Sequence, residues 1–298
     1  KSKRNKIHGT WDMGQSALKT LRALHLSPPT GPPTAFSSLV SSHRHLWRRT
    51  ALTMSKSTDA DKSRPMPPLP PLPIKITDAL RESHGFAEKS HWVIPNILMQ
   101  GTRPGFGLDA TDTSALSEHV RTLVRDAGCR TFVSLQAESI PETGSALLDE
   151  GGFRKPNPKD LPPYAALASS VAEEISSDDA TKPQFLYYGI VGMQTAQSID
   201  SLSNAITDLT ARIKTGETGG VYVHCGGGVG RAGLVCASVL GALYPTISAD
   251  EAMEYTTGLC YLRCEKGKEE GVHYSSPETE DQKEQVRQLF AKIRGGKE

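Results

Sequence analysis

The chain places a cysteine beside an unusually glycine-rich stretch within residues 221–233, VYVHCGGGVGRAG. Glycines lack a Cβ, so a tight loop of them can turn successive backbone N–H groups inward and form an anion-binding nest. Arg231 offers a planar guanidinium that can bind two oxygens of a phosphate at once. The residues expected to bind phosphate are Gly226, Gly227, Gly228, Val229, Gly230 and Arg231.

Cys225 would lie at the bottom of this cradle. Inward N–H groups, a helix N-terminus and a guanidinium all stabilise negative charge, so we expect a thiolate at neutral pH. A thiolate there can attack a phosphate ester in line, expel the alcohol or phenol, and leave a cysteinyl-phosphate that water hydrolyses. The loop N–H groups and Arg231 would stabilise both transition states. His224 precedes the loop, so we expect it to orient the loop and assist thiolate formation rather than act as an acid or base.

The elements that must position this loop follow from apolar periodicity. Residues 221–224 read as a buried strand, and the apolar stretch after Arg231 reads as a buried helix. Further strand-like and helix-like stretches alternate before them, at 92–99, 114–127, 131–135, 185–191 and 199–213. Strands separated by helices predict an α/β fold with three layers, in which helices flank a mainly parallel central sheet. Ligands of such sheets bind at the carboxyl ends of the strands, where Cys225 lies.

Local signals predict where several helices begin and end. Gly128 follows an apolar helical pattern and is expected to adopt the left-handed cap conformation. Ser248 and Glu251 have the spacing of a capping box. The closing helix is expected to begin at SPET, with Pro277 in its first turn.

At this point the residues carry a resemblance to a known family. HCGGGVGR (224–231) matches the His-Cys-x-x-Gly-x-x-Arg signature of the protein tyrosine and dual-specificity phosphatases, and residues 90–293 resemble that superfamily's catalytic domain. The resemblance implies a metal-independent phosphoric monoester hydrolase with no cofactor. By position, it implies that Cys225 is the nucleophile, Arg231 the phosphate ligand and 226–230 the backbone cradle. Gln282, in the closing segment, is a weaker candidate for a role near the site.

Two positions depart from the family pattern. Ala232 stands where the signature usually has Ser or Thr, whose hydroxyl helps the sulfur leave, so dephosphorylation of the intermediate is expected to limit turnover. Gly192 stands where the family carries a general-acid Asp. Asp200 is the nearest acid downstream but lies inside a predicted helix, and Asp178 and Asp179 lie upstream. The general acid is therefore unassigned.

Two functions remain open. The first is an active protein phosphatase of the dual-specificity or tyrosine type, which the intact Cys225 and Arg231 favour. The second is a catalytically impaired phosphatase fold that binds phosphorylated partners, which Gly192 favours. The loop has no lysine or second arginine between Cys225 and Arg231, so a phosphoprotein substrate is favoured over a polyphosphorylated inositol.

Composition restricts the remaining function classes. The net charge of +1 gives no reason to expect nucleic acid or an anionic membrane as partner. No run of about 18 uncharged apolar residues is present, so no membrane span is expected. The five cysteines favour free thiols in a reducing compartment, which suggests the cytoplasm. Cys260, Cys264 and His273 lack a fourth ligand at a recognisable spacing, so no metal site is expected.

The N-terminal third differs in composition from the rest. Residues 1–64 are expected to form a disordered basic extension, and residues 1–53 hold nine Lys/Arg against one acid, Asp12. This pattern is typical of a plastid or mitochondrial transit peptide, although Met54 would make a plausible start for a cytoplasmic protein. Residues 65–89 are predicted to be a proline-rich linker to a catalytic domain at 90–298. Its segment PMPPLPPLP (65–73) should be polyproline II, either as a stiff spacer or as a ligand for an SH3-type partner.

Overall fold

The computed structural model describes residues 69–73, 75–77, 79–85, 89–107, 113–139, 163–176, 182–216, 218–264 and 275–295. The predictions for residues 1–64, Asp178, Asp179 and His273 fall outside these ranges. Among the described residues, no helix combines the length and the apolar character that crossing a bilayer requires. The same residues contain no group of three or more His, Cys, Asp or Glu side chains that could hold a metal ion.

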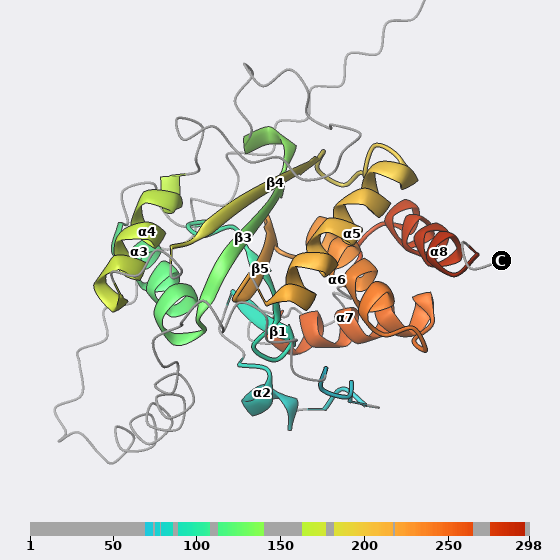
Figure 1. The fold of residues 1–298 in the computed structure, drawn as a ribbon, viewed down its shortest axis with the longest axis horizontal. Coiled ribbons are helices and arrows are strands. Elements are labelled where there is room, and N and C mark those ends of the chain that lie inside the picture. Colours follow the sequence, from blue (N-terminus) through green and yellow to red (C-terminus); the bar gives the residue numbers. More distant parts are fainter. Residues whose placement is uncertain are drawn as a thin grey trace, which may run out of the picture. The chain divides into compact units, whose positions relative to one another are not determined.

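A five-stranded sheet with the order β1-β2-β5-β3-β4 forms the centre of the described domain (Figure 1). β1 and β2 form an antiparallel hairpin, whereas β2–β5, β5–β3 and β3–β4 pair in parallel. The predicted mainly parallel sheet is confirmed, and the strand that ends at Cys225 is its middle strand. The strands are β1 (Ser90–Ile94), β2 (Leu98–Thr102), β3 (Cys129–Gln136), β4 (Gln184–Ile190) and β5 (Gly220–Cys225).

The stretch at 92–99 is divided between two strands, β1 and β2, on either side of Pro95. Pro95 and Asn96 fall in the turn of the β1–β2 hairpin, and Asn96 adopts a positive φ of 61°. Asparagine tolerates this left-handed conformation better than most residues do. The turn reverses the chain, so β2 rather than β1 pairs with β5.

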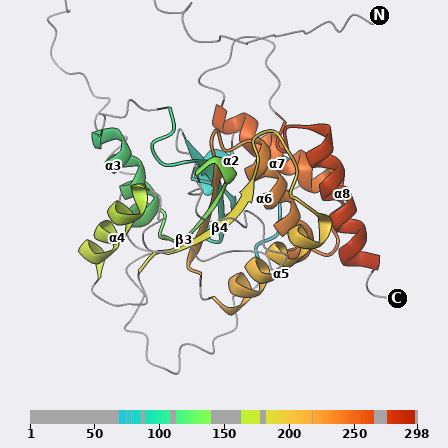
Figure 2. The same ribbon diagram turned by 90° about the horizontal axis from the view of Figure 1, so that it is seen from above.

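Helices cover both faces of the sheet, as Figure 2 shows from above. On one face lie α3 (Thr113–Arg121), its π-helical continuation Thr122–Asp126, and α4 (Pro163–Ile175). On the other face lie α5 (Ile199–Thr215), α6 (Gly230–Leu243), α7 (Ala249–Cys264) and α8 (Glu280–Gly295). The predicted three layers are therefore confirmed.

The alternation of side chains along β5 sets the direction of the site residues. Successive side chains of a strand point to opposite faces. Val221, Val223 and Cys225 belong to the core beneath α5–α8, and Tyr222 belongs to the core beneath α3 and α4. His224 follows Tyr222 in this alternation and contacts Tyr164 of α4. Cys225 and His224 therefore face different helical layers.

The predicted helix ends are confirmed at two places and wrong at a third. Gly128 is left-handed, with φ 68°, and Ser248 and Glu251 exchange backbone-to-side-chain hydrogen bonds. α8 begins at Glu280, so Pro277 lies before the helix rather than in its first turn. The reason is a second capping box: Gln282 N–H donates to the Thr279 hydroxyl, and Thr279 N–H donates to Gln282 Oε1.

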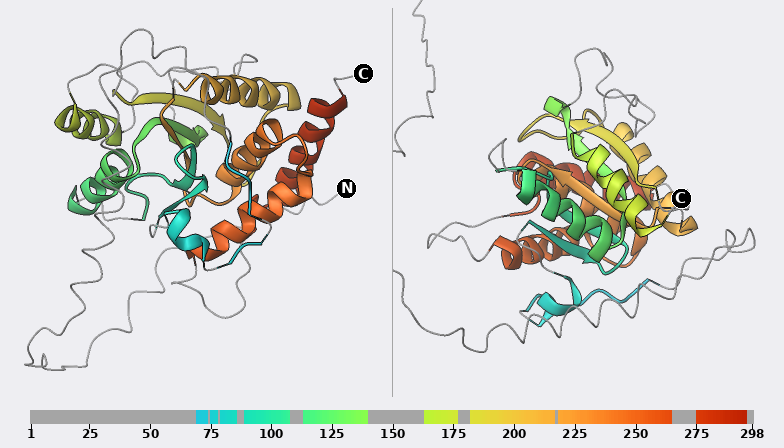
Figure 3. Two further views of the ribbon diagram at one scale, coloured as in Figure 1. Left: turned by 60° about the horizontal axis from the view of Figure 1, so that its bottom comes forward. Right: turned by 90° about the vertical axis from the view of Figure 1, so that its left-hand side faces the viewer.

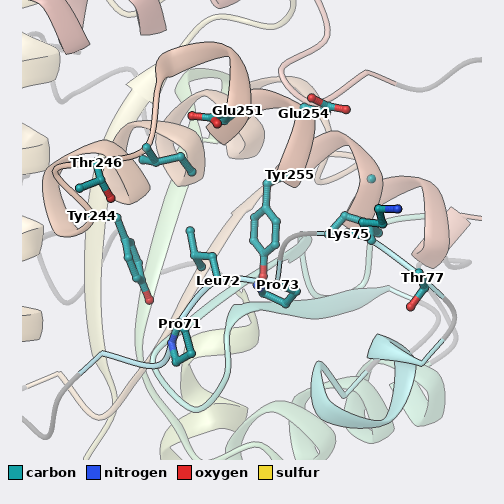
Figure 4. Close-up of a pocket in the computed structure, with 13 residues that line it drawn as sticks. Pro71, Leu72, Pro73, Lys75, Thr77, Tyr244, Thr246, Glu251, Glu254 and Tyr255 are labelled. Carbon is teal, nitrogen blue, oxygen red and sulfur yellow. The ribbon is translucent and has the colours of Figure 1, made fainter.

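The described end of the proline-rich segment packs on α6 and α7 (Figure 3). Leu72 lies against the core beneath these helices, and the Tyr244 hydroxyl donates to the Pro70 carbonyl at 2.9 Å. Ile76 contacts α7 where Gly258 has no side chain; a Cβ there would lie 2.8 Å from Ile76 Cγ1. Residues 69–73 and 75–77 therefore help to hold α7 in place. A cleft between this segment and α7 (Figure 4) is lined by Pro71, Leu72, Pro73, Tyr244 and Tyr255, among others.

Candidate active site

The structure brings the glycine-rich loop, Cys225 and Arg231 together at the carboxyl end of β5. Cys225 is the last residue of the strand and is 4% exposed. α6 begins at Gly230, so its N-terminal end, which carries partial positive charge, starts at the end of the loop. Arg231 lies in the first turn of α6 and is 8% exposed.

The segment after β2 holds the first two carbonyls of the loop. The backbone N–H of Arg103 donates to the carbonyl of Cys225 at 2.7 Å and to that of Gly226 at 3.1 Å. β2 pairs with β5 up to Thr102 and Cys225. The residue that follows β2, Arg103, is therefore placed where its N–H reaches the loop. Sheet register therefore fixes the start of the loop.

A buried arginine of α7 holds the next two carbonyls. Arg263, which is 6% exposed, donates to the carbonyls of Gly227 at 3.4 Å and Gly228 at 2.8 Å. The buried Gln100 of β2 also donates to the Gly228 carbonyl, at 3.0 Å. Gly228 has φ 68°, and a Cβ there would lie 2.3 Å from the carbonyl of Gly101. Only glycine fits this position without displacing β2.

The last loop carbonyl, that of Val229, accepts from the Ser276 hydroxyl at 2.9 Å and from the N–H of Gly233 within α6. All five carbonyls of residues 225–229 are thus held by groups outside the loop. In a trans peptide the carbonyl and the following N–H point in opposite directions. The N–H groups of residues 226–230 are therefore directed to the other side of the loop, where they can converge on an anion.

Arg231 forms a bidentate ion pair with Glu138, a residue that the sequence analysis did not single out. Its Nη1 and Nη2 donate to the two oxygens of Glu138 at 2.7 and 2.9 Å, and Nη1 also donates to the Ile190 carbonyl at 2.9 Å. Partial burial would raise the pKa of Glu138, but the hydrogen bond from Arg231, together with weaker ones, lowers it to about 2. Glu138 is therefore ionised throughout the physiological range.

The ion pair with Glu138 also keeps Arg231 charged and oriented. Burial opposes its charge, but hydrogen bonds to Glu138 and to Cys225 raise the pKa of Arg231 above its ordinary value. Glu138 lies directly after β3, at the same edge of the sheet as Cys225. An acidic residue just beyond the carboxyl end of a parallel strand was the only signal in the sequence that could have suggested it.

His224 is buried on the opposite side of β5 from Cys225. Its Nε2 shares a 2.6 Å hydrogen bond with the hydroxyl of Tyr164, a residue of α4 that the sequence analysis did not single out. Burial lowers the pKa of His224 to about 3, so the ring is neutral at physiological pH. His224 can orient the strand end through Tyr164, and it adds no positive charge beside the thiol.

The turn after β4 lies at the site because the last carbonyl of β4, that of Ile190, accepts a hydrogen bond from Arg231. Gln194 N–H donates to the Val191 carbonyl at 3.1 Å and closes the turn. Val191 and Met193 are 49% and 58% exposed, and Met193 has a positive φ of 63°. Gly192 lies between them with no atom within 4 Å of its missing Cβ. This turn presents two apolar side chains and no carboxylate.

The other acid candidates do not complete the site. Asp200 lies in the first turn of α5 and forms an ion pair with Lys292 of α8. Gln282 is fully buried, and its Nε2 donates to the Gln194 carbonyl at 2.9 Å. Gln282 therefore anchors the turn that follows β4 to the start of α8. Ala232, which is fully buried, supplies no hydroxyl beside the loop.

Comparison with known families agrees with this geometry. A family model described as "PTP-SAK: Swiss Army Knife protein, DSP-PTPase phosphatase domain" matches residues 190–270, which include the Cys225 loop, α6 and α7. This part of the chain therefore resembles a phosphatase domain of the dual-specificity type. The resemblance of HCGGGVGR to the tyrosine and dual-specificity phosphatase superfamily is thereby confirmed.

Solved structures resemble the chain only distantly. Tk-PTP in the active form aligns with a TM-score of 0.42 and 18% identity over 69% of this chain and 98% of that one. PTPMT1 in complex with PI(5)P aligns with a TM-score of 0.43 and 15% identity over 70% and 97%. Kinase associated phosphatase (KAP), with its catalytic-site cysteine replaced by serine, gives 0.42 and 18% over 66% and 87%. No curated protein matches the chain.

Proposed function

We propose that the chain is an active protein phosphatase that hydrolyses phosphate monoesters through a cysteinyl-phosphate on Cys225. The observation that carries the proposal is the set of five loop carbonyls held from outside, because it directs five N–H groups toward one anion site at the end of β5. The buried Arg231 adds a fixed positive charge to that site.

In the first step, the Cys225 thiolate attacks phosphorus, an S–P bond forms, and the bond to the leaving oxygen breaks. The N–H groups of residues 226–230 and the free N–H positions of Arg231 donate to the phosphoryl oxygens as their charge is redistributed. Glu138 keeps the guanidinium in place, so little reorganisation is needed when the substrate binds. The mechanism draws on the chain's own groups and assigns no role to a metal or cofactor.

In the second step, water attacks the phosphocysteine and the S–P bond breaks, which restores the thiolate and releases inorganic phosphate. Ala232 offers no hydroxyl to donate to the departing sulfur. The second step is therefore the slower one in this proposal, and the phosphoenzyme accumulates during turnover.

The proposed substrate is a phosphoprotein, with phosphotyrosine favoured. The turn after β4 carries Gly192 instead of an acid, and a phenol depends less than an alkyl alcohol on protonation of its oxygen as it leaves. The loop between Cys225 and Arg231 has no side-chain cation to match the additional phosphates of an inositol polyphosphate.

A second candidate function is phosphate-dependent binding without turnover. Gly192 favours it, because a cradle that lacks a proton donor could hold a phosphorylated partner without releasing phosphate. Phosphate binding alone does not require a nucleophilic cysteine at position 225, so we favour the active phosphatase over this alternative.

The test is hydrolysis of an aryl phosphate between pH 5 and 8 in the presence of a chelator. Native protein should turn over, whereas Cys225→Ser and Arg231→Ala should not. Cys236→Ala is the matched control, because Cys236 is a buried cysteine of the α6 core that takes no part in the mechanism. Binding of phosphopeptides by native protein without turnover or burst would instead establish the second candidate.

A further inference from the structure

The turn after β4 lacks a carboxylate, and the segment before α8 has a carboxyl beside the end of the loop, that of Glu278. We propose that Glu278, in the segment before α8, is the general acid of the first step and the general base of the second. This inference rests on the proposed function, since it assigns a catalytic residue to the same reaction.

The position of Glu278 follows from its packing against the end of the loop. A Cβ built on Gly230 would lie 2.9 Å from Glu278 Oε2 and 3.1 Å from Glu278 Cβ. The carboxyl is therefore next to the residue whose N–H completes the phosphate cradle. Gln282 Oε1 would lie 3.0 Å from the same point, so glycine at 230 leaves room for both side chains.

The backbone of Glu278 is fixed while its side chain is exposed. Its N–H donates to Gln282 Oε1 at 3.1 Å, and Gln282 is itself anchored in the capping box of α8. The side chain reaches solvent at the edge of the loop. The role we propose requires the side-chain torsions of Glu278 to turn the carboxyl from its place beside Gly230 toward a phosphate bound in the cradle.

Glu278 differs from the other carboxylates near the site in what its oxygens contact. Glu138 is committed to Arg231 by two hydrogen bonds, and Asp200 is paired with Lys292. The carboxylate of Glu278 forms no hydrogen bond or ion pair with any residue in the described ranges. It is therefore available for proton transfer, whereas the other two are held by cations.

The proton balance is simple. In the first step the protonated carboxyl of Glu278 gives its proton to the leaving oxygen as the P–O bond breaks, so the product leaves as a neutral alcohol or phenol. In the second step the resulting carboxylate takes a proton from the attacking water as the new P–O bond forms and the S–P bond breaks.

The test compares substrates whose leaving groups need a proton to different degrees. 2,4-Dinitrophenyl phosphate releases a stable phenolate without protonation, whereas phenyl phosphate does not. Glu278→Gln should lower the rate constant for the first step with phenyl phosphate by about 10²-fold or more, and should change that for the dinitrophenyl ester by less than about threefold. Single-turnover kinetics separate this step from hydrolysis of the intermediate. Asp281→Asn, a loss of a neighbouring exposed carboxylate, is the matched control and should change neither rate.

Each outcome decides between distinct claims. An equal loss on both substrates, or no loss on either, overturns the role of Glu278 but leaves the proposed function standing, because native protein still releases dinitrophenol. A loss in Asp281→Asn equal to that in Glu278→Gln attributes the effect to general charge and also overturns the role. If native protein gives neither turnover nor a dinitrophenol burst, the proposed function fails and the acid role fails with it.

Discussion

Two segments that meet at Arg231 differ sharply in how completely their structure is specified. In the loop that ends at Arg231, the five carbonyls of residues 225–229 are held by β2 and the residue after it, by α7, by α6 and by the segment before α8. The turn of residues 191–194 is exposed, and its positive-φ residue, Met193, projects an apolar side chain outward. Arg231 donates a hydrogen bond to the carbonyl of Ile190, the residue that precedes this turn.

In the proposed mechanism, this difference separates anion binding from proton transfer within the site. The nucleophile and the cradle need many fixed groups, and the chain retains them. A proton donor needs only one carboxyl within reach of the leaving oxygen. In our proposal the segment before α8 supplies this carboxyl in place of the turn after β4.

Arg231→Lys should reduce kcat/KM for an aryl phosphate by about 10²–10³-fold. Lysine keeps the charge but loses the planar fork that contacts Glu138 and the phosphate together. Steady-state kinetics measure the loss, and the inhibition constant of inorganic phosphate should rise in parallel. A loss of less than about tenfold would show that the backbone N–H groups bind the phosphoryl oxygens without the guanidinium.

Glu138→Gln should reduce kcat/KM by about tenfold to 10²-fold, because the amide keeps the shape of the side chain but cannot hold the guanidinium ionically. The pKa of Glu138 is about 2, so the carboxylate is ionised from pH 5 to pH 8. The size of the loss should therefore be constant over that range in a pH–rate profile. A loss that varies with pH would mean that Glu138 takes part in proton transfer.

Gly192→Asp should increase kcat/KM for phenyl phosphate by about tenfold, because it places a carboxyl on the turn after β4. The substitution is accommodated, since no atom lies within 4 Å of the added Cβ. Gly192→Asn is the matched control and should show no gain. If the Asp variant is no faster than the Asn variant, the turn is too far from the leaving oxygen to carry the acid.

Acidification should destabilise the fold through His224. Burial lowers the pKa of His224 to about 3 in the folded protein, whereas an unfolded chain protonates histidine near 6.5. The neutral ring thus contributes stability above pH 6.5, and this contribution is lost as the pH falls from 6.5 toward 3. The folding equilibrium constant should decrease by up to about tenfold per pH unit from this residue.

Denaturant unfolding at several pH values measures this dependence, and the slope should be smaller in His224→Asn. Burial also lowers the pKa of His119, to about 4, so a residual slope is expected in the variant. An unchanged slope would show that His224 is not the main titrating group.

Local patterns were enough to predict the parts of the site that lie on one segment. The strand, the glycines and the helix start around Cys225 are contiguous, so their spacing alone predicted the loop and the parallel sheet. Glu138 and Tyr164 were missed because they reach Arg231 and His224 across the fold, and no spacing in the sequence encodes such contacts. Pro277 predicts too early a start for α8. The Thr279–Gln282 capping box, which the sequence also contains, fixes the start at Glu280.

The most direct test of the central claim is to trap the phosphoenzyme during hydrolysis of an aryl phosphate. Rapid acid quenching followed by peptide mass spectrometry should find phosphate on Cys225, preceded by a phenol burst of about one equivalent per protein molecule. Cys225→Ser should show neither. Turnover without a burst and without phosphate on Cys225, or turnover that persists in Cys225→Ser, would contradict the account.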